Sequence, residues 1–127
     1  MNNLYLKRKI DSYLMEWKEL EDHKPLIVKG PRQVGKTESI RRFAEGAYES
    51  VIYINFVEEP KYKKITEDGY KADDIIRNIS RIDPTKKFEE RKTIIIFDEL
   101  QEYPEIATSL KFFKIDGRFD VICSGSL

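Results

Sequence analysis

A phosphate-binding loop is indicated by the residue types and the spacing of Gly30-Pro31-Arg32-Gln33-Val34-Gly35-Lys36-Thr37. The glycines at positions 30 and 35 allow the backbone to turn its amide N–H groups toward phosphate oxygens. Lys36 would place its ammonium group against the outer phosphates, and Thr37 would offer its hydroxyl oxygen to Mg²⁺. We therefore predict that residues 30–37 bind a nucleotide. The alternative, a chance match in a surface turn, is disfavoured by the apolar run before the loop and the helical pattern after it.

A second group of residues with useful chemistry follows an apolar run at positions 94–97. Consecutive apolar residues suit a strand that is buried on both faces of a parallel sheet. Asp98 would lie at the carboxyl end of this strand, where open α/β sheets bind ligands, and could hold Mg²⁺ opposite Thr37. Glu99 could polarise a water molecule for attack on the γ-phosphate. The alternative is two solvated acids at a strand end, but the phosphate-binding loop upstream favours the metal site.

Two serines follow the last predicted strand, which covers residues 119–123. At the carboxyl end of a strand, Ser124 or Ser126 could donate a hydrogen bond to the γ-phosphate or to the attacking water. The alternative is a polar strand end that only caps a following helix. The residue types alone leave both interpretations open. Cys123, by contrast, suits a small buried apolar position.

The predicted elements alternate between helices and strands. Apolar residues at spacings of three and four predict helices over residues 4–20, 37–45 and 70–81 and another that starts at Pro104. Gly46 is expected to end the second of these helices. Runs rich in β-branched and aromatic residues predict strands at 25–29, 51–56, 93–98 and 119–123. This alternation predicts an α/β fold with a parallel sheet and right-handed crossovers.

Length and composition limit the classes of fold and function. The chain has 127 residues, with 23 basic and 23 acidic side chains, so no overall basic charge indicates nucleic-acid binding. A single cysteine excludes an internal disulfide, and no apolar run approaches the ~20 residues needed to cross a membrane. We expect a cytoplasmic protein in which residues 1–24 form an amphipathic helix packed on a nucleotide-binding core at 25–127. The lone histidine, His23, is expected to be solvated.

The motifs taken together resemble a known family. The segments that carry the resemblance are residues 25–37, Phe97-Asp98-Glu99-Leu100-Gln101 with Tyr103-Pro104-Glu105, Ser109-Leu110-Lys111, and Ser124-Gly125-Ser126-Leu127. They are similar to the AAA-superfamily ATPases of bacteria and archaea that join this domain to a C-terminal domain of unknown function. The resemblance implies a three-layer P-loop NTPase core with strand order 5-1-4-3-2, in which the fourth strand lies between the loop strand and the acidic strand.

The same resemblance implies ATP and Mg²⁺ as cofactors and gives roles to individual residues. Lys36 and Thr37 would contact phosphate and metal, Asp98 would hold the metal, Glu99 would be the catalytic acid, and Ser124 would sense the γ-phosphate. Family members are several hundred residues long. The chain is therefore expected to be the N-terminal part of a longer ATPase, ending before the fifth strand and without the C-terminal domain. The loop strand would then lie at a sheet edge, which favours pairing with a second copy.

Other functions are compatible with a phosphate-binding loop. A small-molecule kinase would need an acceptor pocket and an arginine-bearing lid, and no obvious lid follows Lys36. A GTPase would usually need an Asn-Lys-x-Asp segment, which the chain lacks. A nucleotide-gated interaction module or DNA-associated module, with its effector part elsewhere, stays open, although the zero net charge gives nucleic-acid binding no support.

Overall fold

The computed structural model describes residues 3–30 and 35–126, and the side chains of residues 9–30 and 35–126. Four parallel strands form a sheet in the order β1-β4-β3-β2, which agrees with the predicted order. The strands are β1 (Leu26–Gly30), β2 (Ser50–Asn55), β3 (Thr93–Asp98) and β4 (Asp120–Ser126). The helices are α1 (Asn3–Glu19), α2 (Lys36–Ala47), α3 (Ala72–Ile82) and α4 (Leu110–Asp116), with 3₁₀ turns at Pro60–Tyr62, Leu100–Glu102 and Pro104–Ser109.

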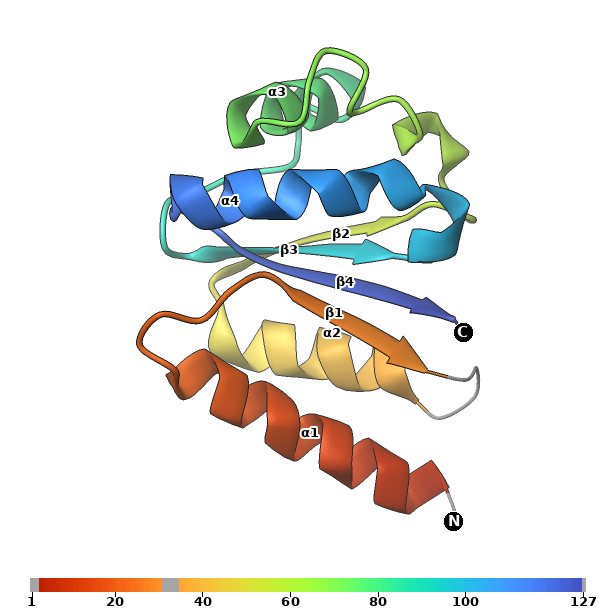
Figure 1. Ribbon diagram of the computed structural model, residues 1–127, viewed down its shortest axis with the longest axis vertical. Coiled ribbons are helices and arrows are strands. Elements are labelled where there is room, and N and C mark those ends of the chain that lie inside the picture. The colour runs from red at the N-terminus through yellow and green to blue at the C-terminus, as the bar shows by residue number, and fades with distance from the viewer. Residues whose placement is uncertain (1–2, 31–34, 127) are drawn as a thin grey trace.

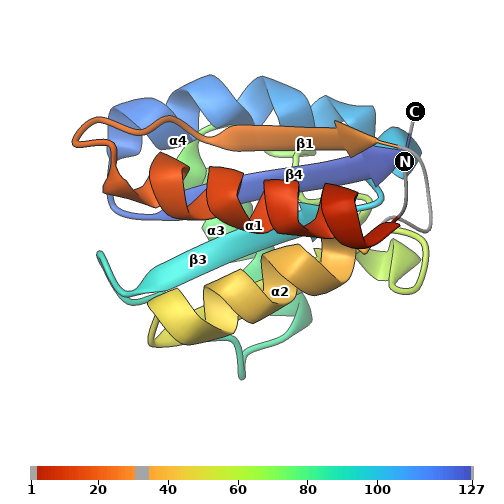
Figure 2. The same cartoon turned by 90° about the horizontal axis from the view of Figure 1, so that it is seen from below.

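Helices cover both faces of the sheet, so the fold has three layers (Figure 1). α3 and α4 lie on one face, and α1 and α2 lie on the other, where Figure 2 shows them in front of the strands. All strands are parallel, so their carboxyl ends meet at one edge of the sheet. The α/β class and the parallel pairing predicted from the sequence are confirmed.

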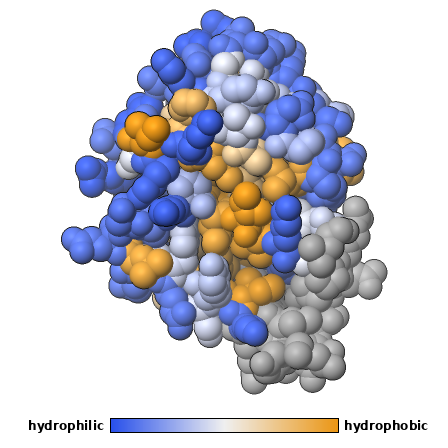
Figure 3. All heavy atoms as spheres, in the orientation of Figure 1, coloured by the Kyte–Doolittle hydropathy of each residue, from blue (hydrophilic) through white to orange (hydrophobic). Residues whose placement is uncertain are grey.

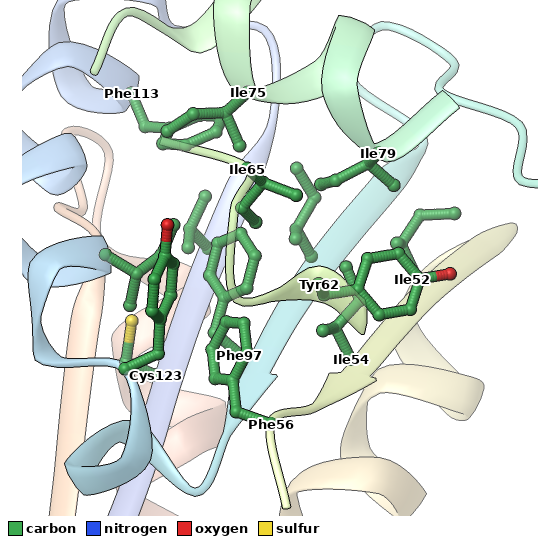
Figure 4. Packing of buried hydrophobic residues seen from close by; sticks show 14 of the residues in the cluster. Ile52, Ile54, Phe56, Tyr62, Ile65, Ile75, Ile79, Phe97, Phe113 and Cys123 are labelled. Atoms are coloured by element: carbon green, nitrogen blue, oxygen red, sulfur yellow. The ribbon is translucent and has the colours of Figure 1, made fainter. Parts of the chain in front are cut away.

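The central strand β3 is buried along its whole length because its residues before Asp98 serve two cores in turn. Ile94 and Ile96 pack with α1 and α2, whereas Ile95 and Phe97 pack with α3 and α4. Figure 4 shows the second of these clusters, in which the rings of Phe56 and Phe97 stack with their centroids 5.9 Å apart. Each such side chain contributes roughly 1.5–3 kcal/mol by its burial. The apolar run in the sequence therefore becomes a strand with a core on either side.

The first helix, α1, packs against α2 through one side of its surface. Leu14 and Trp17 are buried among α2 and sheet residues, and the Trp17 ring meets Phe43 edge-on at 6.3 Å between centroids. The indole N–H of Trp17 also donates to the Lys24 carbonyl oxygen at 2.7 Å. This contact ties the end of α1 to the segment that leads into β1.

The expectation that His23 is solvated is wrong. Its Nε2 lies 2.7 Å from Asp120 Oδ1 at the start of β4, and its Nδ1 lies 3.0 Å from the Leu20 carbonyl oxygen. The imidazole also meets the Trp17 ring edge-on, with the centroids 4.7 Å apart. The other carboxylate oxygen of Asp120 accepts a hydrogen bond from the Tyr48 hydroxyl. The histidine thus helps to fasten the amino end of β4 to the segment before β1.

Several predicted boundaries also differ from the structure. α2 continues past Gly46 and ends where Tyr48 takes an extended backbone conformation. β4 continues to Ser126 because its last residues pair with β1. The helix predicted from Pro104 begins as a 3₁₀ turn and becomes α-helical only at Leu110. These shifts move the serines after residue 123 from beyond the strand into it.

The loop strand β1 lies at an edge of the described sheet, because it pairs only with β4. Its Ile27 side chain is 41% exposed. Figure 3 shows the side of the molecule on which this edge lies. Apolar residues gather in the middle of that side, over β4 and β1, next to hydrophilic residues. The expected edge position of the loop strand is thus found in the described part of the fold.

None of the described helices is both long enough and apolar enough to span a membrane.

The contribution of α1 to the core can be measured with two neighbouring variants. Leu14→Ala should lower the free energy of unfolding by about 2–5 kcal/mol, because Leu14 is 0% exposed and its loss leaves a cavity. Met15→Ala should change it by no more than about 0.5 kcal/mol, because Met15 is 57% exposed. Urea unfolding followed by circular dichroism gives both values. Equally small losses would mean that α1 does not unfold together with the sheet.

Candidate functional site

Polar side chains from neighbouring strands meet at the carboxyl edge of the sheet. Asn55 of β2 is in register with Asp98 of β3, and Phe97 of β3 is in register with Cys123 of β4. Asp98 and Ser124 therefore follow at the next position of adjacent strands. Phe97 and Cys123 point into the core beneath α3 and α4. Since side chains alternate between faces, Asp98 and Ser124 point the other way, toward the face covered by α2.

The described part of the phosphate-binding loop leads directly into α2. Gly35 precedes the helix with φ 76°, in the left-handed region that favours glycine. Lys36, the first residue of α2, is 8% exposed, and no acid in the described ranges pairs with it. A buried ammonium group needs a negatively charged partner, and the sequence predicts that nucleotide phosphates are this partner. The predicted ligands that lie outside the described residues are Pro31, Arg32, Gln33 and Val34.

The carboxylate of Asp98 is buried, with 3% of the residue exposed, and accepts hydrogen bonds on both oxygens. Oδ2 accepts from the Thr37 hydroxyl at 3.1 Å and from the Tyr53 hydroxyl at 2.5 Å. Oδ1 accepts from the backbone N–H of Glu99 at 2.8 Å. The contact with Thr37 joins the first turn of α2 to the end of β3. The structure thus brings together the two residues that the sequence predicts as metal ligands.

Sequence reasoning missed Tyr53, which it treated as an ordinary aromatic residue of a strand. Its hydroxyl donates to Asp98 and accepts a hydrogen bond from Asn55 Nδ2 at 3.3 Å. Asn55 in turn accepts the backbone N–H groups of Val57 and Glu58, which fixes the turn after β2. Burial and the neighbouring Asp98 carboxylate raise the pKa of the Tyr53 hydroxyl, so it stays protonated and can donate. The available signal was the spacing of Tyr53 and Asn55, which puts both on one face of β2.

Glu99 leaves the line of β3 because its backbone lies in the left-handed region at φ 61°. A non-glycine residue pays about 1–2 kcal/mol for this conformation. Glu99 Oε2 accepts a hydrogen bond from Gln101 Nε2 at 2.6 Å. Gln101 Oε1 accepts the backbone N–H of Ser126 at 3.2 Å. These contacts link the predicted catalytic acid to the end of β4.

Ser124 has a buried hydroxyl inside β4. The residue is 1% exposed, and its Oγ has no hydrogen-bond partner among the described residues. A buried polar group without a partner costs roughly 1–3 kcal/mol, which an arriving phosphate oxygen or water could recover. Ser124 lies within β4, which continues to Ser126, and both roles suggested for its hydroxyl stay predictions.

The oxygen donors at the site suit Mg²⁺. The Thr37 hydroxyl and the Asp98 carboxylate are the hard oxygen ligands that Mg²⁺ prefers. Within residues 9–30 and 35–126, no group of three His, Cys, Asp or Glu side chains could hold a metal ion by itself. Mg²⁺ would therefore need phosphate oxygens and water as further ligands, which is its usual mode of binding. The residues present fit a Mg-nucleotide better than an isolated metal ion.

Two hollows of the described structure lie away from these residues. One, of about 330 Å³, is lined by Trp17, His23 and Asp120, among others, near the amino ends of the strands. The other, of about 430 Å³, is lined by residues of α3 and α4 that include Ala72 and Ile115. Neither hollow includes a residue of the predicted nucleotide site, so the carboxyl edge of the sheet remains the candidate site.

Residues 22–127 match a protein-family model described as "AAA domain". No curated protein sequence matches the chain. Among solved structures, PCH-2 from C. elegans is similar, with a TM-score of 0.56 and 15% sequence identity. The similarity covers 96% of this chain but only 37% of that chain, so this chain matches well under half of its length. At this identity the likeness shows the fold alone, which is the three-layer α/β fold predicted for the chain, and the family match over residues 22–127 shows that this fold is an AAA domain.

The packing of the 99–101 turn on β4 predicts opposite effects for two glycine substitutions. A Cβ at Gly125 would lie 3.0 Å from Gln101 Oε1 and 3.2 Å from Leu100 Cβ, so Gly125→Ala should cost about 1–3 kcal/mol of stability. A Cβ at Gly46, in α2, would meet nothing within 4 Å, so Gly46→Ala should add about 0.5–1 kcal/mol. Chemical denaturation measures both. Equal stability of the two variants would contradict the close packing of this turn.

Proposed function

The chain belongs to the AAA-domain family of P-loop ATPases, and from this premise we propose that it binds ATP with Mg²⁺ and hydrolyses the nucleotide. The observation that carries the proposal is the 3.1 Å hydrogen bond between Thr37 and Asp98. It connects the helix that follows the phosphate-binding loop to the strand that ends in the acid. A Mg-nucleotide would lie between these two elements.

Binding of the phosphates would depend on the first turn of α2. Lys36 would neutralise charge on the outer phosphates, and the positive end of the α2 dipole would add to this attraction. The Thr37 hydroxyl donates a hydrogen bond to Asp98, which leaves the lone pairs of its own oxygen available for a metal ion. Thr37 and Asp98 would hold Mg²⁺ beside the phosphates, where the ion would supply positive charge.

Hydrolysis would depend on groups at the ends of β3 and β4. Glu99 would orient and polarise the attacking water. The Ser124 hydroxyl would donate to the γ-phosphate or to that water. An arginine finger, where one operates, adds about 10³–10⁵-fold to the rate of hydrolysis, and the family resemblance gives this role to no residue of the chain. We expect little turnover by this chain alone, and we propose that a further domain of the same protein responds to its nucleotide state.

Binding can be tested with a thermal melt in the presence and absence of Mg-ATP. Ligand at about 100 times its Kd stabilises a fold by roughly 2.7 kcal/mol, which should raise Tm by several degrees. Lys36→Ala should abolish most of this rise because it removes the buried ammonium group. Lys87→Ala removes an exposed lysine beside the amino end of β2 and should keep the rise.

The same samples separate binding from hydrolysis. Glu99→Gln should keep the rise in Tm with Mg-ATP and lower the release of phosphate, because the amide cannot polarise water as a carboxylate does. An unchanged Tm in the wild-type protein, with cooperative melting, would contradict nucleotide binding. Slow phosphate release that is measurable in the wild type and equally fast in Glu99→Gln would contradict the role of Glu99 alone.

We also propose that the open edge of β1 pairs with a second copy of the chain. The proposal rests on the edge position of β1 and on the 41% exposure of Ile27. Ile27→Glu should shift the protein toward monomer in analytical ultracentrifugation. Ile115→Glu removes an 80% exposed isoleucine from α4 and should leave the association unchanged. A wild-type protein that stays monomeric at high concentration would contradict pairing at this edge.

A further inference from the structure

We propose that Tyr53 is a positioning residue that sets the orientation of the Asp98 carboxylate and so favours Mg²⁺ over larger cations. The inference rests on the proposed function, because it concerns the metal ion that would accompany ATP. Tyr53 lies in β2, which carries none of the residues predicted to bind the nucleotide or the metal.

The hydrogen bonds to Asp98 leave its carboxylate little freedom. An ionised carboxylate has about four lone-pair positions, two on each oxygen. The hydroxyls of Thr37 and Tyr53 both donate to Oδ2 and so occupy both positions there. The backbone N–H of Glu99 occupies one position on Oδ1. A metal ion, or a water bound to it, is therefore directed to the remaining position on Oδ1.

Tyr53 is itself held on two sides. The guanidinium carbon of Arg41, on α2, lies 4.3 Å from the centre of the Tyr53 ring. Asn55 donates to the Tyr53 hydroxyl and is fixed by the turn after β2. The phenol is thus a donor whose ring and hydroxyl are both restrained. It can hold the Asp98 oxygen in place while Thr37 adjusts to a ligand.

The preference among cations follows from this restraint. The terminal torsion of an aspartate is broad, so a carboxylate with fewer donors samples more orientations. Mg²⁺ demands near-ideal octahedral geometry, whereas Ca²⁺ accepts variable geometry and more ligands. Loss of the Tyr53 hydroxyl should therefore weaken the binding of Mg²⁺ more than the binding of Ca²⁺. Loss of a partner that orients a metal ligand typically costs about 10–100-fold in metal affinity.

The test is Tyr53→Phe, which keeps the ring and removes only the hydroxyl. Tm is measured at saturating ATP while MgCl₂ or CaCl₂ is added to the EDTA-treated protein. We expect the half-saturating Mg²⁺ concentration to rise about tenfold and that of Ca²⁺ to rise less. The rise in Tm caused by ATP in EDTA should be the same as in the wild type. A loss of fold stability alone would not change the ratio of the two cation concentrations.

Tyr103→Phe is the matched control. It also removes a tyrosine hydroxyl with hydrogen bonds, here to the backbone N–H and the hydroxyl of Thr66, at 3.1 and 2.5 Å. Because these contacts lie outside the site, Tyr103→Phe should keep the wild-type ratio of cation concentrations. Arg41→Met, an exposed substitution that removes the stacked guanidinium, should change the ratio in the same direction as Tyr53→Phe.

The outcomes separate this inference from the proposed function. A wild-type protein whose Tm does not respond to either cation in the presence of ATP overturns both. A wild-type protein that responds to Mg²⁺, with the same ratio of cation concentrations in Tyr53→Phe and Arg41→Met, overturns the role of Tyr53 and leaves the proposed function intact. A fall in Mg²⁺ preference in both variants supports the role of Tyr53.

Discussion

Burial of the Asp98 carboxylate is the constraint on which the rest of the site depends. Asp98 is only 3% exposed, and a carboxylate is tolerated at such a position only where polar groups donate hydrogen bonds to it. The donors come from separate elements: Thr37 from the first turn of α2, Tyr53 from β2, and the backbone of Glu99 from the turn after β3. Each element must reach the same point, so the register of β2 on β3 and the docking of α2 are fixed together.

The two faces of the sheet have different tasks. The face beneath α3 and α4 is packed with apolar side chains. On the face beneath α2, Ile94 and Ile96 pack in the core and Asp98 continues the same line at the end of β3. The period of two along a strand therefore leads from the core directly to the site. Ile40 of α2 is buried in that core, so the packing that stabilises the helix also places Thr37 beside Asp98.

The end of β4 connects the remaining groups. Ser124 is buried within this strand, and the backbone N–H of Ser126 reaches Glu99 through the Gln101 side chain. Gly125 lies between them, in a space that a Cβ would overfill. A displacement of the end of β4 would therefore move both the Ser124 hydroxyl and the Glu99 side chain.

Local sequence patterns were enough to predict several features of the fold. The apolar periods predict which segments are helices and which are strands, glycine spacing predicts the loop before α2, and an acid after a buried run predicts Asp98 at a strand end. Resemblance to a family supplied the strand order, which the fold confirms.

Contacts between side chains far apart in the sequence could not be predicted and became visible in the folded structure. The contact of His23 with Asp120 spans 97 residues, that of Tyr53 with Asp98 spans 45, and that of Gln101 with Ser126 spans 25. The extension of β4 through Ser124 likewise depends on its pairing with β1. Hydrogen bonds of this kind depend on strand register and helix docking, and the burial that makes them necessary arises only when the whole sheet has formed.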